Sequence, residues 1–316
     1  MFLEKGFLPT NKFWKYLVGS LIIITASTIG QIPWVVAIVI KSFKTGKPFP
    51  TTESEMMSFL SMNNTLFLLL FSFVVAFFAI ILVVKYFHRQ SFLSVTTSRD
   101  KVDWKRILFS FSLWGIFTAG STVAMYYSSP ESFVLNFKPI PFLILAIIGT
   151  LLIPIQTSTE EYVFRGYLMQ GFAVLAKNRW FPLVMTSVIF GTMHIANPEV
   201  EKMGYIVLIY YIGTGFFLGI ITLMDEGMEL ALGFHAANNL VTALLVTSDW
   251  SAFQTNSVFK DVSSPSAGFE ILVPIFIIFP ILLFIFSKKY GWSNWKEKLT
   301  GTIEIQKPIE NVENHE

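Results

Sequence analysis

Eight long apolar stretches constrain the fold of this chain more than any other feature of its sequence. Most of them fall within or above the range of roughly 17–25 residues that a helix needs to cross a bilayer. In lipid, backbone polar groups must bond within their own segment, so such stretches form helices. We therefore predict an all-α fold, a polytopic membrane helix bundle of about eight transmembrane helices. The predicted spans are Trp14–Ile40, Leu66–Tyr86, Ile107–Tyr127, Phe142–Leu175, Trp180–Ile195, Tyr205–Met224, Leu230–Val246 and Phe269–Phe286.

The low content of charged residues excludes an ordinary soluble domain. Charged residues make up 14% of the 316 residues and hydrophobic residues 53%, whereas about 25% of the residues of a soluble domain are charged. The net charge of +2 gives no electrostatic reason to expect nucleic acid as a partner. The absence of cysteine excludes a thiol nucleophile, a disulfide and a thiolate-bound metal. The lipid bilayer is the first partner that we expect.

The distribution of Lys and Arg predicts the orientation of the chain. With eight spans, both termini lie on one side. The N-terminal segment, the second, fourth and sixth loops and the C-terminal tail carry 16 basic residues, and the other loops carry 6, with Arg165 excluded because it lies within a span. Cytoplasmic loops are the ones enriched in Lys and Arg. We therefore expect both termini in the cytoplasm, with a polar, partly disordered tail from Lys288 onward.

The fourth span must extend into a polar sequence. Its apolar part, Phe142–Gln156, is shorter than a straight span requires, so we expect one long helix that continues to Leu175. A bend is expected near Pro154, because proline removes a backbone hydrogen bond. The extension carries the segment 157–166 to membrane depth, where each ionisable group costs roughly 2.5–3.5 kcal/mol and persists mainly where it pairs or performs chemistry.

Two neighbouring acids and one arginine dominate that segment. Glu161 lies four residues before Arg165, which is the favourable order for an ion pair on one helix face. The side chain of Glu160 points about 100° away from that of Glu161, so it needs another explanation. In a soluble protein both acids would be read as caps of a helix that starts after Thr159. The membrane setting favours a structural pair, Glu161 with Arg165, and a separate functional acid, Glu160.

Two of the four histidines lie within apolar spans and can meet Glu160. Counted from the turn at residues 177–179, Glu160 and His194 lie at similar depth on antiparallel helices, so we expect them to face each other. His235 and Asn239 share one helix face, but His235 lies so near its own turn that the count leaves its depth unexplained. For one such residue alone, a simple hydrogen bond between helices is an equal alternative. The remaining histidines are expected to be solvated: His88 and His315.

The polar residues of spans four, five and seven resemble three ordered motifs of a known family. Glu160-Glu161-Tyr162-Val163-Phe164-Arg165 resembles EExxxR, Phe190-x-x-x-His194 resembles FxxxH, and His235-x-x-x-Asn239 resembles HxxxN. This pattern is similar to that of the CPBP intramembrane proteases, which include type 2 CAAX prenyl endopeptidases and bacterial lysostaphin-resistance-protein-A-like and abortive-infection proteins. The resemblance covers about Phe142–Val246, and every motif residue is present.

The resemblance implies a multi-pass protein of a bacterial cell membrane that hydrolyses a peptide bond in a membrane-associated peptide or protein. By this resemblance, Glu160 is the general base on water and is aided by His194. His235 and Asn239 would stabilise the oxyanion, while Glu161 with Arg165 would position the first acid. A CAAX peptide as the substrate is not implied by the resemblance alone.

Zinc is the alternative to a metal-free site. Two histidines and a carboxylate form an acceptable zinc set with a fourth position open for water, here Glu160, His194 and His235. Against zinc, the sequence lacks His-Glu-x-x-His, and Glu160 would be a ligand and not a base. We therefore expect a glutamate-dependent site without a metal or other cofactor.

Two non-proteolytic functions are compatible with the same residues. One is a membrane scaffold or bacteriocin-immunity-type protein that uses the polar pocket to bind a partner. The other is a transporter, since buried acids and histidines also form proton relays; the first three spans, however, show no counterpart that would indicate an inverted repeat.

We divide the chain into residues 1–138 with the first three spans, 139–248 with the catalytic core, and 249–316 with the last loop, the last span and the tail.

Overall fold

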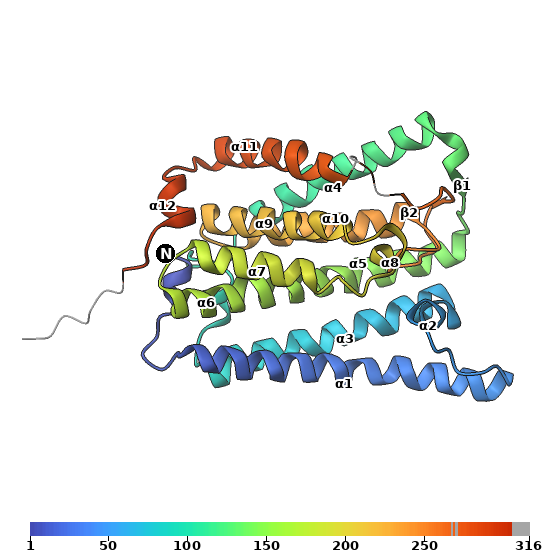
Figure 1. Cartoon of the computed structure of the whole chain (residues 1–316), viewed down its shortest axis with the longest axis horizontal. Coiled ribbons are helices and arrows are strands. Elements are labelled where there is room, and N and C mark those ends of the chain that lie inside the picture. The colour runs from blue at the N-terminus through green and yellow to red at the C-terminus, as the bar shows by residue number, and fades with distance from the viewer. Residues whose placement is uncertain (267, 269–270, 305–316) are drawn as a thin grey trace, which may run out of the picture.

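In the computed structural model, which describes residues 1–266, 268 and 271–304, long helices run side by side in one bundle (Figure 1). Eight helical crossings connect the two ends of the described chain: α1 (Phe13–Thr45), α3 (Met62–Leu82), α4 (Trp104–Ser128), α5 (Pro139–Glu161) continued by α6 (Met169–Ala176), α7 (Trp180–Thr192), α9 (Val207–Asp225), α10 (Glu229–Leu245) and α11 (Phe279–Tyr290). Within the described residues, five helical segments are long and apolar enough to cross a membrane. The prediction of an all-α polytopic bundle is confirmed.

Shorter elements interrupt or connect the long helices. The 3-10 helices are η1 (Leu3–Gly6), η3 (Phe92–Val95) and η4 (Pro130–Ser132), and the π-helical segments are η2 (Val83–Phe87), η5 (Tyr162–Leu168) and η7 (Pro274–Ile278). The short α-helices are α2 (Glu53–Phe59), α8 (Pro198–Met203) and α12 (Trp295–Thr300). A small sheet contains β1 (Phe133–Leu135), β2 (Val246–Thr247) and β3 (Phe259–Asp261). Its central strand β3 pairs antiparallel with β1, Val134 opposite Lys260, and parallel with β2.

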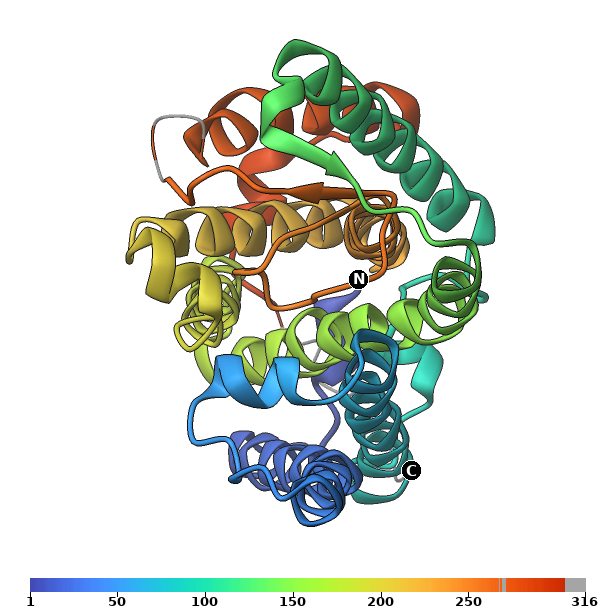
Figure 2. The ribbon, with the colours of Figure 1, turned by 90° about the vertical axis from the view of Figure 1, so that its right-hand side faces the viewer.

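The two ends of the bundle differ in their elements. Helices η1 and α12 lie at one end, which we call the N-terminal end, and α2, α8 and the sheet lie at the other, which we call the sheet end (Figure 1). Helix α10 packs between α4 and α5, while α1 packs on α3 and α7 on α9. Seen from the sheet end, α1 and α3 lie on one side and α4 and α11 on the other (Figure 2). This arrangement surrounds the C-terminal part of α5 with other helices.

Glycine permits the close contact between α7 and α9. A Cβ atom added to Gly215 would lie 2.8 Å from the carbonyl oxygen of Ser187, so only glycine fits at this crossing. The outward faces of the bundle carry large apolar side chains; Ile116 and Ile140 are each 73% exposed. In a bilayer these side chains contact lipid, which is why they need no protein partner.

The long fourth span differs in detail from the prediction. The α-helix continues through Pro154 to Glu161, and the departure from α-helical geometry comes at η5, immediately after the two acids. We expected the irregularity at Pro154 because of its missing N–H group. The wider π-helical turn instead accommodates Arg165, whose fully buried side chain lies inside the bundle. Such π segments are frequent at functional sites.

His88 is buried, so the prediction that it is solvated was wrong. Its side chain is fully inaccessible; Nδ1 lies 3.0 Å from Oδ1 of Asn11 and Nε2 lies 2.8 Å from the hydroxyl of Tyr167. The N-terminal segment covers this region, since Asn11 contacts His88 directly and Phe2 and Leu3 are also buried. Sequence reasoning placed His88 at an open membrane edge and did not foresee that the chain's own N-terminus packs over it.

Two other predicted boundaries need adjustment. The fifth span ends at Thr192, so His194 lies in the turn after α7 and not within the helix. The tail that we expected to be partly disordered contains α12, which packs against α9. The predicted start of the last span at Phe269, His315 and the end of the tail lie outside the described residues.

Candidate active site

The two acids at the end of α5 have different surroundings. Glu161 is fully buried, whereas the side chain of Glu160 is 19% exposed and lines a cavity of about 700 Å³. Neighbouring positions on a helix diverge by about 100°, so one acid faces the protein interior and the other faces the cavity. The roles predicted for the two acids, structural for Glu161 and functional for Glu160, stay predictions.

Glu161 and Arg165 form the expected ion pair. Nη1 of Arg165 donates to Oε1 of Glu161 at 3.0 Å, and both side chains are fully buried. Nη2 donates to the carbonyl oxygen of Gly215 at 3.2 Å, and the guanidinium lies 4.4 Å from the ring centre of Phe190. The arginine therefore ties η5 to α7 and α9, the two helices behind the site.

His235 lies between the two acids. Its Nδ1 donates to Oε1 of Glu161 at 2.7 Å, and its Nε2 lies 3.5 Å from Oε2 of Glu160. Because the carboxylate of Glu161 only accepts, Nδ1 carries a hydrogen and Nε2 is the nitrogen that faces Glu160. We expected His194 to be the histidine that faces Glu160; in the described part of the chain, His235 holds this closer position.

The buried turn before α10 explains the depth of His235. We assumed that the turn 225–227 lies at the membrane surface. Asp225 is 4% exposed and Glu229 is fully buried, and Arg99 forms ion pairs of 3.0 Å with both. Phe2, directly before η1, donates its backbone N–H to Glu226 at 2.7 Å. Because other segments cover the turn, a count from it underestimates how deep His235 lies.

His194 lines the same cavity from the turn after α7. Its Nδ1 donates to the carbonyl oxygen of Phe190 at 2.8 Å, and its ring stacks on that of Tyr211 at 4.2 Å. With Nδ1 protonated, the neutral ring presents Nε2 as a hydrogen-bond acceptor. His194 and Glu160 both line the cavity, so the predicted convergence of these residues is seen without a direct bond between them.

A chain of side-chain amides leads to Glu160. The indole Nε1 of Trp114 donates to Asn238 at 3.0 Å, and Asn238 donates to Oδ1 of Asn239 at 3.1 Å. Asn239 donates to Oε1 of Gln156 at 3.1 Å, and Gln156 donates to Oε1 of Glu160 at 2.6 Å. Every bond points in the same direction, from the indole to the carboxylate.

Sequence reasoning found Asn239 but missed the other members of the amide chain. Gln156 had a usable signal, since it precedes Glu160 by four residues and therefore shares its helix face. Asn238 adjoins Asn239 in the sequence. Trp114 lies on α4, far away in the sequence, and no local pattern connects it with the acids.

Polar side chains line the part of the cavity next to Glu160, among them Gln156, His235 and Asn239. Among the described residues that line it there is no Lys or Arg, and its acids are Glu160, Glu199 and Asp261.

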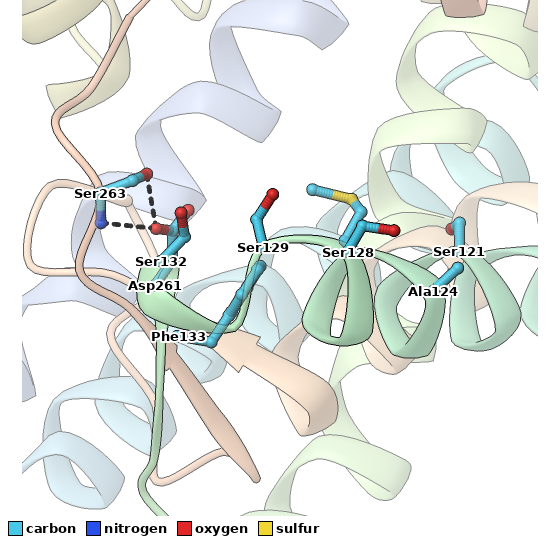
Figure 3. Close-up of a pocket in the computed structure, with 9 residues that line it drawn as sticks. Ser121, Ala124, Ser128, Ser129, Ser132, Phe133, Asp261 and Ser263 are labelled. Carbon is cyan, nitrogen blue, oxygen red and sulfur yellow. Dashed lines mark hydrogen bonds between the residues drawn. The ribbon is translucent and has the colours of Figure 1, made fainter.

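A second pocket, of about 400 Å³, lies near the sheet (Figure 3). Its carboxylate, Asp261, accepts bonds from the backbone and hydroxyl of Ser263. Because Asp261 is the one titratable side chain among the described residues of that pocket, we place the candidate active site in the larger cavity.

The donor geometry gives no metal cluster in the described part of the chain. No group of three or more His, Asp or Glu side chains lies close enough together there to hold a metal ion. His235 directs one nitrogen to Glu161 and the other toward Glu160, and Nδ1 of His194 is bonded to a carbonyl oxygen.

Comparisons with known proteins match the region that contains these residues. Residues 136–241 match the family model described as type II CAAX prenyl endopeptidase Rce1-like. Over 259 residues, the chain is 29% identical to YyaK of Bacillus subtilis strain 168, an uncharacterized protein, covering 80% of this chain and 83% of that protein. No solved structure matches the chain.

Proposed function

We propose, from the membership of residues 136–241 in the Rce1-like family of type II CAAX prenyl endopeptidases, that this membrane protein is a glutamate-dependent intramembrane endopeptidase. Its substrate is a membrane-associated protein or peptide, and Glu160 activates the water that attacks the peptide bond. The observation that supports this proposal best is the contrast between the two acids. Glu161 is buried in an ion pair, whereas Glu160 faces a cavity large enough for a peptide segment.

Glu160 supplies the proton transfers of peptide hydrolysis. Its carboxylate takes a proton from water as the water oxygen attacks the carbonyl carbon. The same carboxyl group then gives that proton to the nitrogen of the leaving amine as the C–N bond breaks. Gln156 holds Oε1 of Glu160 by a 2.6 Å hydrogen bond, which leaves Oε2 as the oxygen that meets water. Nε2 of His194, the acceptor nitrogen, provides a second point that can orient this water.

His235 is suited to stabilise the oxyanion. When it is protonated on both nitrogens, its charge and that of Arg165 balance the charges of Glu160 and Glu161. Nδ1 remains bonded to Glu161, and the Nε2–H can turn from Glu160 to an oxygen atom that gains charge in the transition state. Donors aimed at such an atom in a site shielded from water lower the barrier substantially.

Asn239 provides a further donor. One N–H of its amide is bonded to Gln156, and its Oδ1 accepts from Asn238. The amide has two N–H groups, so the second is available to the substrate. Since the bonds on both sides fix the direction of the amide, this donor needs little reorganisation when the oxyanion forms.

A metal-free mechanism keeps the carboxylate of Glu160 available as a base. The Nδ1 atoms of His235 and His194 are protonated and donate to Glu161 and to the carbonyl oxygen of Phe190. Their Nε2 atoms keep a lone pair, so the metal-free proposal rests on the role of Glu160 and not on the histidines. In the metal-free reaction Glu160 remains a base, whereas zinc would use it as a ligand.

The test compares cells that produce the natural protein, Glu160→Gln or Glu201→Gln. Glu201 lies exposed on α8 and serves as a control for the same chemical change. New protein termini in the membrane fraction, identified by mass spectrometry, should appear with the natural protein and Glu201→Gln and be absent with Glu160→Gln, because the amide cannot take a proton. Equal termini in all three would contradict the role of Glu160. No termini with any of them would favour a scaffold or immunity protein.

A further inference from the structure

The cavity extends from the acids toward one end of the bundle only. Beyond His235, its lining follows α10 toward the sheet end through Thr242 and Val246 and reaches Trp250 in the following loop. From the other side of the bundle, Met57 of α2 contributes to the lining. Helix α2 lies at the sheet end (Figures 1 and 2). The route from Glu160 therefore leads to the sheet end.

The N-terminal end is closed beneath the acids. Glu161 and Arg165, directly below Glu160 in this direction, are fully buried. Further along, a core of buried apolar residues includes side chains from η1, α1 and η5, namely Phe2, Leu3, Tyr16, Tyr162 and Tyr167. Among the described residues that line the cavity, none comes from η1, η3 or α12. A peptide has no comparable route from this end.

The two ends also differ in basic residues. Among the described residues, the sheet end carries six, which are Lys41, Lys44, Lys47, Lys138, Lys202 and Lys260, while the other described Lys and Arg residues except Arg165 lie at the N-terminal end. Cytoplasmic surfaces of membrane proteins are the ones rich in Lys and Arg. This places the open, sheet end of the cavity on the extracytoplasmic side.

We infer that the substrate is a neutral or basic polypeptide segment that enters from the extracytoplasmic side of the membrane. This inference rests on the proposed function. The cavity contains acids and, among its described lining residues, no Lys or Arg. In the proposed mechanism the charges of His235 and Arg165 balance those of Glu160 and Glu161, so a free C-terminal carboxylate would meet the further acids Glu199 and Asp261, whereas a basic or neutral segment is compatible with these walls. The substrate is therefore cleaved within a segment exposed outside the cytoplasm, and not at a cytoplasmic C-terminal carboxylate.

The depth of the acids sets the length of that segment. His235 lies ten residues before the end of α10 at Leu245, which corresponds to about 15 Å along the helix. An extended chain covers at most about 3.3–3.6 Å per residue, so at least about five residues are needed between the surface and the scissile bond. A flexible terminus or an unwound end of a transmembrane helix can supply a segment of this length.

Cysteine labelling tests the direction of the opening without any need for activity. The chain has no cysteine, so single variants give a clean signal. Ala196 is exposed and lines the cavity, while Lys101 is exposed at the N-terminal end. In intact cells a membrane-impermeant maleimide should label Ala196→Cys, and Lys101→Cys should be labelled only after permeabilisation. The reverse pattern, or equal labelling of both in intact cells, would overturn the inference.

The termini that depend on Glu160 test the substrate class. In the comparison of natural protein with Glu160→Gln, these termini should lie in extracytoplasmic segments, within stretches of neutral or basic residues. Termini that depend on Glu160 but lie in cytoplasmic segments would overturn the inference and leave the proposed protease activity intact. The absence of any such termini counts against the proposed activity, and the maleimide pattern then still decides on which side the cavity opens.

Discussion

The side-chain amide of Gln156 donates a hydrogen bond of 2.6 Å to Oε1 of Glu160 from one helical turn earlier on α5. Its carbonyl oxygen accepts from Asn239 of α10, so the amide cannot turn around without losing both bonds. The direction is set at the far end by Trp114, because an indole N–H can only donate. A residue on α4 therefore helps to fix the orientation of the candidate general base.

Gln156→Met should reduce turnover without disturbing the fold. Methionine has a similar length but cannot donate to Glu160 or accept from Asn239. We expect kcat to fall roughly 10- to 100-fold, the effect of losing a hydrogen bond to a charged group, with little change in KM. The matched control is Gln31→Met, because Gln31 is exposed and lines the same cavity. Equal rates in the two variants would exclude a positioning role for Gln156.

Trp114→Phe should have a smaller effect of the same kind. The phenyl ring keeps the aromatic packing against Phe234 but removes the donor to Asn238. We expect about a fivefold loss in kcat, corresponding to about 1 kcal/mol for one hydrogen bond. Trp292→Phe is the control, since it also loses an indole donor, here to Asp225, away from the cavity. The hypothesis fails if both variants lose the same activity.

Glu161→Gln should destabilise the protein. The change leaves the charged side chain of Arg165 buried beside a neutral amide. Breaking one side of a buried ion pair typically costs about 3–5 kcal/mol. Glu160→Gln should be tolerated, because its side chain is partly exposed to the cavity. The measurement is the thermal unfolding of both purified variants in the same detergent. A Glu161→Gln variant as stable as Glu160→Gln would show that the ion pair is not structural.

Metal content separates the two mechanisms considered for the site. We expect the active purified protein to contain clearly less than one equivalent of metal, measured by elemental analysis on the preparation used for the assay. Chelators alone are a poor test, because they can disturb the cavity of a membrane protein. Stoichiometric zinc that disappears together with activity in His194→Ala and His235→Ala would replace the metal-free mechanism by a zinc mechanism.

His88 should make the protein less stable in acid. Burial, together with the nearby charge of Lys15, lowers the pKa of His88 to about 4, below its value in an unfolded chain of about 6.5. Between these values the unfolded chain binds more protons, so stability falls as pH decreases through this window, by at most about 1.4 kcal/mol per pH unit.

His88→Gln provides the comparison for this pH effect. Glutamine can form hydrogen bonds with Asn11 and Tyr167 but does not titrate in this range. The difference in unfolding temperature between pH 7 and pH 4.5 should be smaller in this variant than in the natural protein. An unchanged difference would assign the acid sensitivity to other groups.

The sequence by itself determined the features that depend on local spacing and on the lipid environment. Apolar stretches of sufficient length predicted an all-α membrane bundle, because a backbone in lipid has no other way to satisfy its polar groups. The spacing of Glu161 and Arg165 predicted their ion pair, since four residues bring two side chains to one helix face. The same geometry separated Glu160 from Glu161.

Only the tertiary structure decided which side chains from different helices meet. The rotation of α10 against α5 brings His235 between the two acids and Asn239 to Gln156, and no local period encodes that rotation. The N-terminal segment buries His88 and the turn before α10 through contacts across more than 70 residues of sequence. The direction of the cavity follows from the same packing, because segments that are distant in sequence fill its closed end. Local sequence patterns do not predict contacts between such segments.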